Sequence, residues 1–373
     1  MSISSRPKTA PSIAVDRGER LFVGLDVHKR SHHVTVWSRE RGAVAQWVQP
    51  SEARVLIERL RPLRDHIALI VHEAGPTGYG LVRALRAEAF AAEVVAPSKL
   101  PLMVSEAKCD RLDSRRLAQF ASQGLVRPIC VPTPEQEADR ETVRARGRAV
   151  IDVRRAKHQI RSFLLRHSLP EPKSWGPKGQ ALLHSLVIEA GLAPCFESLM
   201  ASLLDAQRRL SSLSQAVAAL AASERHAQAI AHLSSVPGVG LLTAMVFRTE
   251  VFAPERFARG EQVAAFVGLA PRVRASGESR REGPISKAGN GRVRTALIEA
   301  AWLWVRCDAA AARRHRHLLG RTGSAQKAIV AMARRLAIVL QQRREKRSTA
   351  SVVRIGACLM TAAPGWWAWT HGL

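Results

Sequence analysis

Strand-like segments are concentrated in the N-terminal third of the chain, and this uneven distribution constrains the fold more than any other feature. Residues 21–50 contain three short apolar runs, LFVGLDV, HHVTVWS and AVAQWVQ, separated by turn-forming or charged residues. Such runs predict three consecutive strands joined by tight turns. A helix at 51–63, the buried strand HIALIVHEA, a helix at 77–88, the strand AAEVVAP and a helix at 110–124 are expected next. An antiparallel meander followed by strand, helix and strand predicts an α/β domain with a mixed sheet.

Beyond residue 134 the pattern becomes helical, and strand-like segments almost vanish until the 270s. Residues 135–168 form a strongly basic helical pattern, and residues 197–232 form a second long pattern rich in Ala, Leu and Ser. Together they predict an antiparallel helical pair or coiled coil. A helix is expected at about 254–268, then a polar loop or hairpin at 270–291, then helices to about residue 361.

The charge balance indicates a polyanionic partner. Lys and Arg number 57 against 31 Asp and Glu, which gives a formal net charge of +26. Such a chain repels itself unless a polyanion neutralises it, and nucleic acid is the simplest candidate. An anionic membrane surface is the competing interpretation, but the sequence has no apolar run of about 18 residues and no signal peptide. We therefore expect a cytoplasmic protein of the bacterial nucleoid, without a membrane partner.

Acidic residues are scarce, yet four of them stand where a metal site would need them. Asp110 and Asp113 are one helical turn apart, where two like charges are unfavourable unless a cation lies between them. Asp26 lies in the first apolar strand and Glu73 ends the strand IALIVHEA, where an ionised carboxylate is costly without a partner. Neighbouring Lys and Arg side chains could supply the cation. Four carboxylates could instead hold one or two Mg²⁺ ions, with water completing the coordination.

Two further patterns predict contacts with nucleic acid. In LSSVPGVGLLTAMVF, Gly238 and Gly240 permit a tight turn between two helices whose backbone amides can bind a phosphate, as in a helix-hairpin-helix. A buried helix turn with glycines for close packing explains these residues about as often. The basic pattern at 135–168 is either a solvated helix face or a nucleic-acid surface. Its arginines on one face are Arg140, Arg144, Arg148 and Arg155.

Several spaced motifs identify a family. GLDVHK, HEAGPTGYG, KCDRLDSRRLAQF, LSSVPGVG, AAFVGLAPR, ASGES, ISKAGNGRVRTALIEAA and KAIVAMARRLA follow one another over roughly residues 21–345. In these motifs the chain resembles insertion-sequence transposases with an N-terminal DEDD, RuvC-like domain and a C-terminal transposase-20-type domain, also called bridge-RNA-guided serine recombinases. The resemblance implies an acidic quartet at Asp26, Glu73, Asp110 and Asp113, which binds Mg²⁺ or, in its place, Mn²⁺.

The resemblance also implies a nucleophilic serine, placed in a polar loop after GLxPR and just before a glycine. Ser276 holds this position, although Ala275 and Glu278 depart from the commoner pattern, which leaves Ser279 as an alternative. Read without the family, a loop serine is usually a turn former. Basic residues around the loop could bind a scissile phosphate and stabilise its transition state. They are Arg272, Arg274, Arg280, Arg281, Lys287, Arg292 and Arg294.

The resemblance implies a transposase that excises and inserts an insertion sequence through a serine–DNA intermediate, guided by a bridge RNA. Its partners would be the element ends, the target DNA, the guide RNA and further copies of the chain, as a dimer that pairs into a tetramer. Two alternatives stay open. One is a RuvC-like, metal-dependent, structure-specific DNA endonuclease that uses water, and the other is a non-enzymatic nucleic-acid-binding protein.

The expected fold class is therefore α/β plus all-α. A disordered arm at 1–20 precedes an RNase-H/RuvC-like catalytic domain at 21–133. A helical linker or coiled coil at 134–229 follows. A transposase domain at 230–345 carries the catalytic serine and a helix-hairpin-helix-like motif, and a tail at 346–373 ends the chain.

Overall fold

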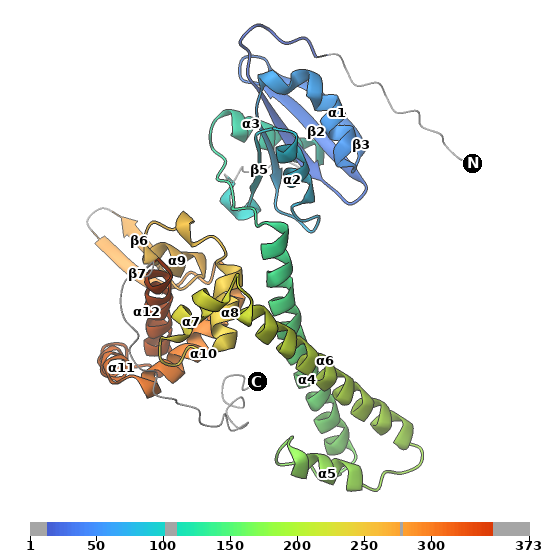
Figure 1. Ribbon diagram of the computed structural model, residues 1–373, viewed down its shortest axis with the longest axis vertical. Coiled ribbons are helices and arrows are strands. Elements are labelled where there is room, and N and C mark those ends of the chain that lie inside the picture. Colours follow the sequence, from blue (N-terminus) through green and yellow to red (C-terminus); the bar gives the residue numbers. More distant parts are fainter. Residues whose placement is uncertain (1–12, 101–109, 277–278, 346–373) are drawn as a thin grey trace. The chain divides into compact units, whose positions relative to one another are not determined.

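The computed structural model describes residues 13–100, 110–276 and 279–345 (Figure 1). The chain forms two compact units, Met1–Ala138 and Asp139–Leu373. Most of the expected arm and all of the expected tail lie outside the described residues. No helix in the described ranges is both long and apolar enough to cross a membrane.

A five-stranded mixed sheet forms the centre of the first unit, in the order β3-β2-β1-β4-β5 (Figure 1). β1 (Leu21–Val27), β2 (Ser31–Ser38) and β3 (Gly42–Pro50) form an antiparallel meander. β4 (Ile67–Glu73) runs parallel to β1, and β5 (Ala92–Val95) runs parallel to β4. The predicted mixed sheet of an RNase-H-like α/β domain is confirmed.

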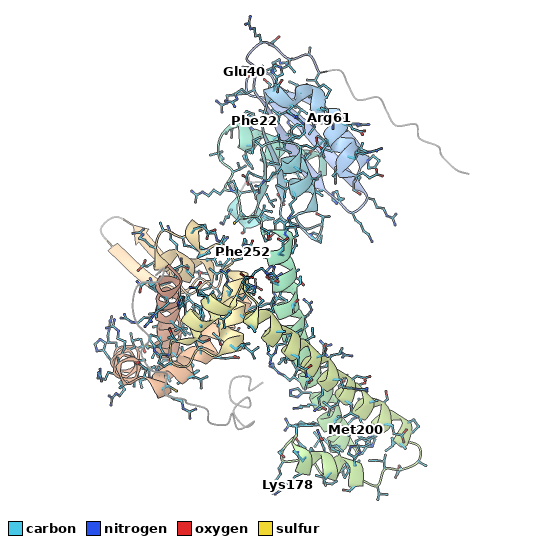
Figure 2. All side chains as sticks on the ribbon, viewed as in Figure 1. Phe22, Glu40, Arg61, Lys178, Met200 and Phe252 are labelled. Carbon is cyan, nitrogen blue, oxygen red and sulfur yellow. The ribbon has the colours of Figure 1, made fainter. Side chains whose placement is uncertain are left out.

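Helices cover both faces of this sheet. α1 (Ala53–Leu60) and α2 (Gly80–Ala87) bury their apolar faces with Leu21, Val23 and Leu25 of β1. α3 (Asp110–Ser122) packs on the opposite face, where its buried side chains join those of alternate strand residues, among them Phe22, Val71, Leu117 and Ala121 (Phe22 is labelled in Figure 2). Alternate residues of one strand thus serve two cores, as the pleat requires.

The predicted helix at 51–63 is shorter in the structure, because α1 ends at Leu60 and a 3₁₀ segment, η1 (Arg61–His66), follows. Pro62 explains the change. Proline has no N–H to donate within an α-helix, so the α-helical hydrogen bonding cannot continue through Pro62.

Two long helices dominate the first part of the second unit. α4 (Pro134–Arg166) and α6 (Ala193–Ala222) share an apolar cluster with the short α5 (Pro177–Ser185), which the sequence analysis did not anticipate. Met200 of α6, labelled in Figure 2, belongs to this cluster. The ring of Phe163 lies 5.4 Å from that of Phe196, whereas Arg146 donates to Ser214 farther along, at 3.3 Å. These contacts confirm the predicted antiparallel pair.

The expected single helix at 197–232 is wrong at one point, because α6 ends at Ala222 and α7 (Ala227–Ser234) begins a new helix. Ser223 adopts an extended conformation, and its hydroxyl donates to the carbonyl oxygen of Leu220. His226 is buried against Asp139, at 2.8 Å. The break therefore lies beside a contact between His226, which precedes α7, and Asp139 of α4.

The remaining helices enclose one apolar core, to which Phe247, Leu297, Met332 and Leu336 contribute. A two-stranded hairpin stands between the helices at 260–266 and 291–307. The predicted helix at 254–268 divides into a 3₁₀ turn and a short helix. The elements are α8 (Leu241–Glu250), η3 (Pro254–Arg256), α9 (Gly260–Phe266), β6 (Pro271–Ser276), β7 (Ser279–Ile285), α10 (Gly291–Cys307), α11 (Ala309–Thr322) and α12 (Ala325–Glu345).

Candidate active site

Asp26 and Glu73 stand at the carboxyl ends of neighbouring parallel strands. Asp26 is the penultimate residue of β1, and Glu73 is the last residue of β4. Leu25 of β1 pairs with His72 of β4. Asp26 and Glu73 are the next residues on these two strands, so the two acids lie at the same level of the sheet. Phe22 and Val71 face the α3 side of the sheet, and side chains alternate along a strand. Both acids therefore occupy positions on the α3 face.

α3 lies close against the backbone of β1. A Cβ atom on Gly24 would collide with the carbonyl oxygen of Ser114 and would lie 2.5 Å from the backbone nitrogen of Ala118. The hydroxyl groups of Thr35 and Ser114 are hydrogen-bonded at 2.9 Å, and Thr35 pairs with Gly24 in the sheet. Glycine is thus required at position 24 for the helix to reach this face.

The direction of α3 places its first turn at the acidic end of β1. At its other end, the Arg39 guanidinium donates to the carbonyl oxygen of Ser122 at 2.6 Å. Arg39 directly follows β2, whose last residue, Ser38, pairs with Leu21 at the start of β1. α3 therefore runs opposite to β1, so its first turn, which contains positions 110 and 113, lies toward the strand ends of Asp26 and Glu73.

The described carboxylates already have polar neighbours. Asp26 is 21% exposed and lies 3.1 Å from the Nε2 atom of His28. Asp113 is 35% exposed, and one of its oxygens lies 3.5 Å from an Nη atom of Arg116. Among the described residues, no three His, Cys, Asp or Glu side chains are grouped so as to hold a metal ion. The side chain of Asp110 is not among those described, so the convergence of all four carboxylates stays a prediction.

The sequence analysis missed two buried histidines, His32 and His72, which lie near the same ends of the strands. His72 is almost fully buried, its Nδ1 atom lies 3.0 Å from the carbonyl oxygen of Glu73, and burial lowers its pKa. Burial also lowers the pKa of His32, and the nearby His72 and His28 lower it further. Burial therefore disfavours the charged form of both imidazoles. The sequence did contain a signal for these two histidines, because each one occupies an inward-facing position in an apolar strand.

Ser276 lies at the tip of the hairpin in the second unit. It is the last residue of β6, and it pairs with Ser279, the first residue of β7. The two candidate nucleophiles thus flank one tight turn, whose residues 277–278 lie outside the described ranges. Their side chains are not described, so the choice between them is not tested.

The base of the hairpin is fastened to its surroundings. Backbone bonds join Ser286 to Ala270 at 2.8 Å and Lys287 to Gly268 at 3.2 Å. The Arg294 guanidinium donates to the carbonyl oxygens of Val267 (2.9 Å) and Lys287 (3.2 Å). The Arg272 guanidinium donates to the carbonyl oxygen of Ser286, at 3.3 Å. Two of the arginines predicted to bind phosphate therefore also hold the base of the hairpin.

Glu250 organises the helices below the hairpin. Its carboxylate is only 2% exposed, and it receives two bonds from Arg144 (2.7 and 2.8 Å) and one from the Asn290 amide (2.8 Å). Burial by itself would raise the pKa of Glu250, but Arg144 and Asn290 outweigh it and hold that pKa below its ordinary value. Asn290 also caps α10, accepting from the backbone of Arg292 and Val293.

This network corrects the interpretation of the basic face on α4. Arg140 is buried beside the ring of Phe252, at 5.6 Å, and Arg144 is paired with the buried Glu250. Arg148 and Arg155 are exposed, with loose pairs to Glu141 (3.5 Å) and Asp152 (3.7 Å). The four arginines do not form a single exposed surface, because the first two pack within the second unit.

The Pro-Gly-Val-Gly turn joins α7 to α8. Gly238 has a φ of +82°, and a Cβ there would collide with the backbone of Trp304 in α10. Close packing explains this glycine, as the alternative interpretation held. Gly240 is exposed and precedes the first residue of α8, with open space around its Cα. Its predicted contact with phosphate is not tested.

Comparison with known proteins agrees with this geometry. Residues 23–168 match a DEDD transposase domain, and residues 230–316 match the model described as "Transposase IS116/IS110/IS902 family". The first unit is thus an RNase-H-like domain of the DEDD transposase class.

Three relatives are named as transposases. The putative transposase y4qE of Sinorhizobium fredii is 32% identical over 291 residues, which cover 76% of this chain and 71% of that protein. A probable family 20 transposase of Pseudomonas aeruginosa is 28% identical over 77% of this chain and 85% of its own length. The transposase for insertion sequence element IS1533 of Leptospira borgpetersenii is 26% identical over 76% of this chain and 85% of its own length. This chain belongs to the IS116/IS110/IS902 family of transposases.

Proposed function

We propose that this protein moves an insertion sequence by cutting and rejoining DNA through a covalent link to Ser276. The observation that supports the proposal is the packing of α3 on β1, because the first turn of α3, with positions 110 and 113, then lies toward the strand ends that carry Asp26 and Glu73. Asp26, Glu73, Asp110 and Asp113 would hold Mg²⁺ or Mn²⁺. Their donors are all carboxylate oxygens, the ligands that these ions prefer. When bound, the metal supplies positive charge that stabilises the transition state of phosphoryl transfer.

The reaction through Ser276 proceeds in two steps and needs no reactant besides the DNA and a base. The Ser276 hydroxyl oxygen attacks the phosphorus of a scissile phosphodiester, its proton passes to a base, and the DNA oxygen that leaves takes up a proton. One DNA end is then esterified to the serine, and the other carries a hydroxyl. A DNA hydroxyl attacks the phosphoserine in the second step, which restores the serine and joins the strand. One phosphoester replaces another in each step.

The residues around the hairpin suit this reaction. Its base is fixed by Arg272 and Arg294, and Lys287 and Arg292 are exposed nearby. The positive end of the α10 dipole lies directly after the hairpin and favours an anion. A hydroxyl is a weak nucleophile without a base or a metal. We propose that the acidic quartet, from the same or another copy of the chain, supplies this activation.

We further propose that a guide RNA and a dimer that pairs into a tetramer complete the assembly. The net charge of +26 supports a nucleic-acid partner beyond the scissile strands. Exposed Arg148 and Arg155 on α4 and the exposed Gly240 are candidate contacts to phosphate. RNA that copurifies with the protein, and that changes the DNA cleaved when its sequence is changed, would support this part.

A cleavage assay tests the covalent intermediate. The protein is incubated with a labelled element end and Mg²⁺, and adducts are resolved after denaturation. Wild type should form a DNA–protein adduct, and Ser276→Ala should form none. Ser286→Ala is the matched control from the base of the same hairpin and should retain the adduct. An adduct that survives Ser276→Ala but disappears in Ser279→Ala would move the nucleophile to Ser279.

The metal proposal has a separate readout. Asp26→Ala and Asp113→Asn should abolish Mg²⁺-dependent cleavage while the melting temperature stays close to that of wild type. Cleavage without an adduct in wild type would favour the water-using endonuclease. No cleavage under any metal or RNA condition would favour the non-enzymatic binding protein.

A further inference from the structure

The helices α11 and α12 carry an excess of positive charge, and Glu345, the last residue of α12, is the one acidic residue in their sequences. Between Asp308 and Glu345 the sequence has nine Lys or Arg residues and no Asp or Glu. None of them belongs to the candidate site described above. Seven are exposed in the structure, namely Arg313, Arg314, Arg316, Arg321, Lys327, Arg335 and Arg343.

The arginines of α11 occupy its outer face. Ala311 and His315 are buried, and this inner side of the helix packs against α10 and α12. Figure 1 shows α11 beside α12, viewed nearly along its axis. Asp308 caps the start of α11, accepting from the backbone of Ala311 at 2.6 Å, and Gly323 ends it with a φ of +63°. The four arginines therefore project from a helix that is fixed at both ends, and we name them the α11 arginines (Arg313, Arg314, Arg316 and Arg321).

The described part of the protein gives the α11 arginines no acidic partner. Within the described part of the chain, none of the α11 arginines forms an ion pair, whereas Arg54, Arg61 and Arg208 pair with Glu58, Glu88 and Asp205. Of the segments outside the described ranges, residues 1–12 and 346–373 contain no Asp or Glu, and residues 101–109 and 277–278 contain one Glu each. Another copy of the chain is an equally poor source, because each copy carries a net charge of +26.

We propose that the α11 arginines bind the phosphate backbone of double-helical DNA, an inference that rests on the proposed function and gives the transposase a second DNA contact. Arg313 and Arg321 are about 12 Å apart along the helix axis at 1.5 Å per residue. That length spans about three to four phosphates of one strand at about 3.4 Å each. Leu319 is the one exposed large apolar residue among the described residues of α11, which is too little to anchor a membrane.

The proposal assigns these arginines to phosphates rather than to the guanine edges that arginine can also read, so it predicts a contact that is independent of base sequence. α11 contains no Asn or Gln, the side chains that read adenine in the major groove. Phosphate contacts made by arginines fix the position of a duplex, and they weaken steeply as salt rises. The α11 surface thus holds DNA that other parts of the assembly select.

Salt-dependent binding by the full-length protein tests this proposal. Arg313→Gln, Arg316→Gln and Arg321→Gln are combined, and affinity for an element-end duplex and an unrelated duplex of equal length is measured in EDTA over a range of KCl. The plot of log K against log [KCl] should become shallower by about 2 to 3, at about 0.9 per lost contact. Affinity at low salt should fall about tenfold or more, equally for both duplexes. Replacing the same arginines by lysine should retain the wild-type slope.

The matched control combines Arg54→Gln, Arg61→Gln and Arg208→Gln, which removes the same charge from arginines that already have acidic partners. It should change the slope little. An unchanged slope in the α11 variant, or an equal loss in the control, would overturn the proposal. So would a loss confined to duplex RNA or to vesicles of anionic phospholipid. Because binding is measured without metal, the result does not depend on the serine chemistry, and failure of the adduct assay leaves it interpretable.

Discussion

The two candidate regions, the edge of the sheet in the first unit and the hairpin in the second, are positioned by different means. At the edge of the sheet, Asp26 and Glu73 belong to packed strands, and the direction of α3 is set by the contact of Gly24 with Ser114. At the hairpin, Ser276 extends from a base that a few hydrogen bonds fasten to α9 and α10. The first arrangement depends on close backbone packing, and the second depends on buried polar groups that need their partners. Substitutions should therefore damage the two regions by different mechanisms.

The largest expected effect lies below the hairpin. Glu250→Gln removes the charge that compensates Arg144 and should destabilise the second unit by about 3 kcal/mol. Glu141→Gln is the matched control, because Glu141 also contacts Arg144, at 3.1 Å, but is half-exposed. It should cost less than about 1 kcal/mol. Urea unfolding followed by hydrogen exchange, read separately for each unit, measures both. Equal costs for the two variants would show that burial of Glu250 is not what matters.

A second substitution attacks the edge of the sheet. Gly24→Ala adds a Cβ where the α3 backbone already lies, so α3 must shift, at a cost of about 2 kcal/mol. DNA cleavage should fall with it, because the acids on α3 move. Gly75→Ala introduces the same methyl group into open space and should leave both properties nearly unchanged. Hydrogen exchange should locate the damage in the first unit. Full cleavage by Gly24→Ala would separate the position of α3 from catalysis.

A smaller effect is expected at the cap of α10. Asn290→Ala removes two cap bonds and one bond to Glu250, and should cost about 1 to 2 kcal/mol. Asp308→Ala removes a comparable cap from α11, away from the hairpin. Both should lower the midpoint of thermal unfolding, but only Asn290→Ala should slow formation of the covalent adduct. A similar slowing in both would indicate general destabilisation.

The smallest effect depends on pH and concerns His32, one of the two buried histidines described in the first unit. The pKa of His32 is lowered by burial and by His72 and His28, so the folded state binds fewer protons than the unfolded state below the ordinary pKa of about 6.5. The contribution of His32 to the stability of the first unit is therefore lost as pH falls from about 7 to 5. The urea midpoint of the first unit should decrease over this interval, and less steeply in His32→Asn. His232→Gln, an exposed control in the second unit, should leave the decrease unchanged.

Local sequence patterns were sufficient for much of the fold. Alternation of apolar residues located the strands of the sheet, and the basic helical pattern located α4 to within two residues. The break between α6 and α7 was missed, and it lies beside a contact of His226 with Asp139, 87 residues earlier, that no local pattern shows. The short α5 was also missed, since its residues show no sustained period. Elements whose boundaries depend on distant partners are the ones that local periodicity cannot place.

The sequence alone determined the alternation of strands and helices, the order of the four acids and the large excess of positive charge, because each is a property of neighbouring residues or of composition. Only the tertiary structure decided which way α3 crosses β1, and which arginines are already paired. Arg144 and Glu250 lie 106 residues apart, and no local pattern shows that they meet. The α11 arginines look the same in sequence, but none of them forms an ion pair with any residue that the structure describes. The sequence fixes which residues are charged, whereas the neutralisation of these charges depends on which groups folding brings together.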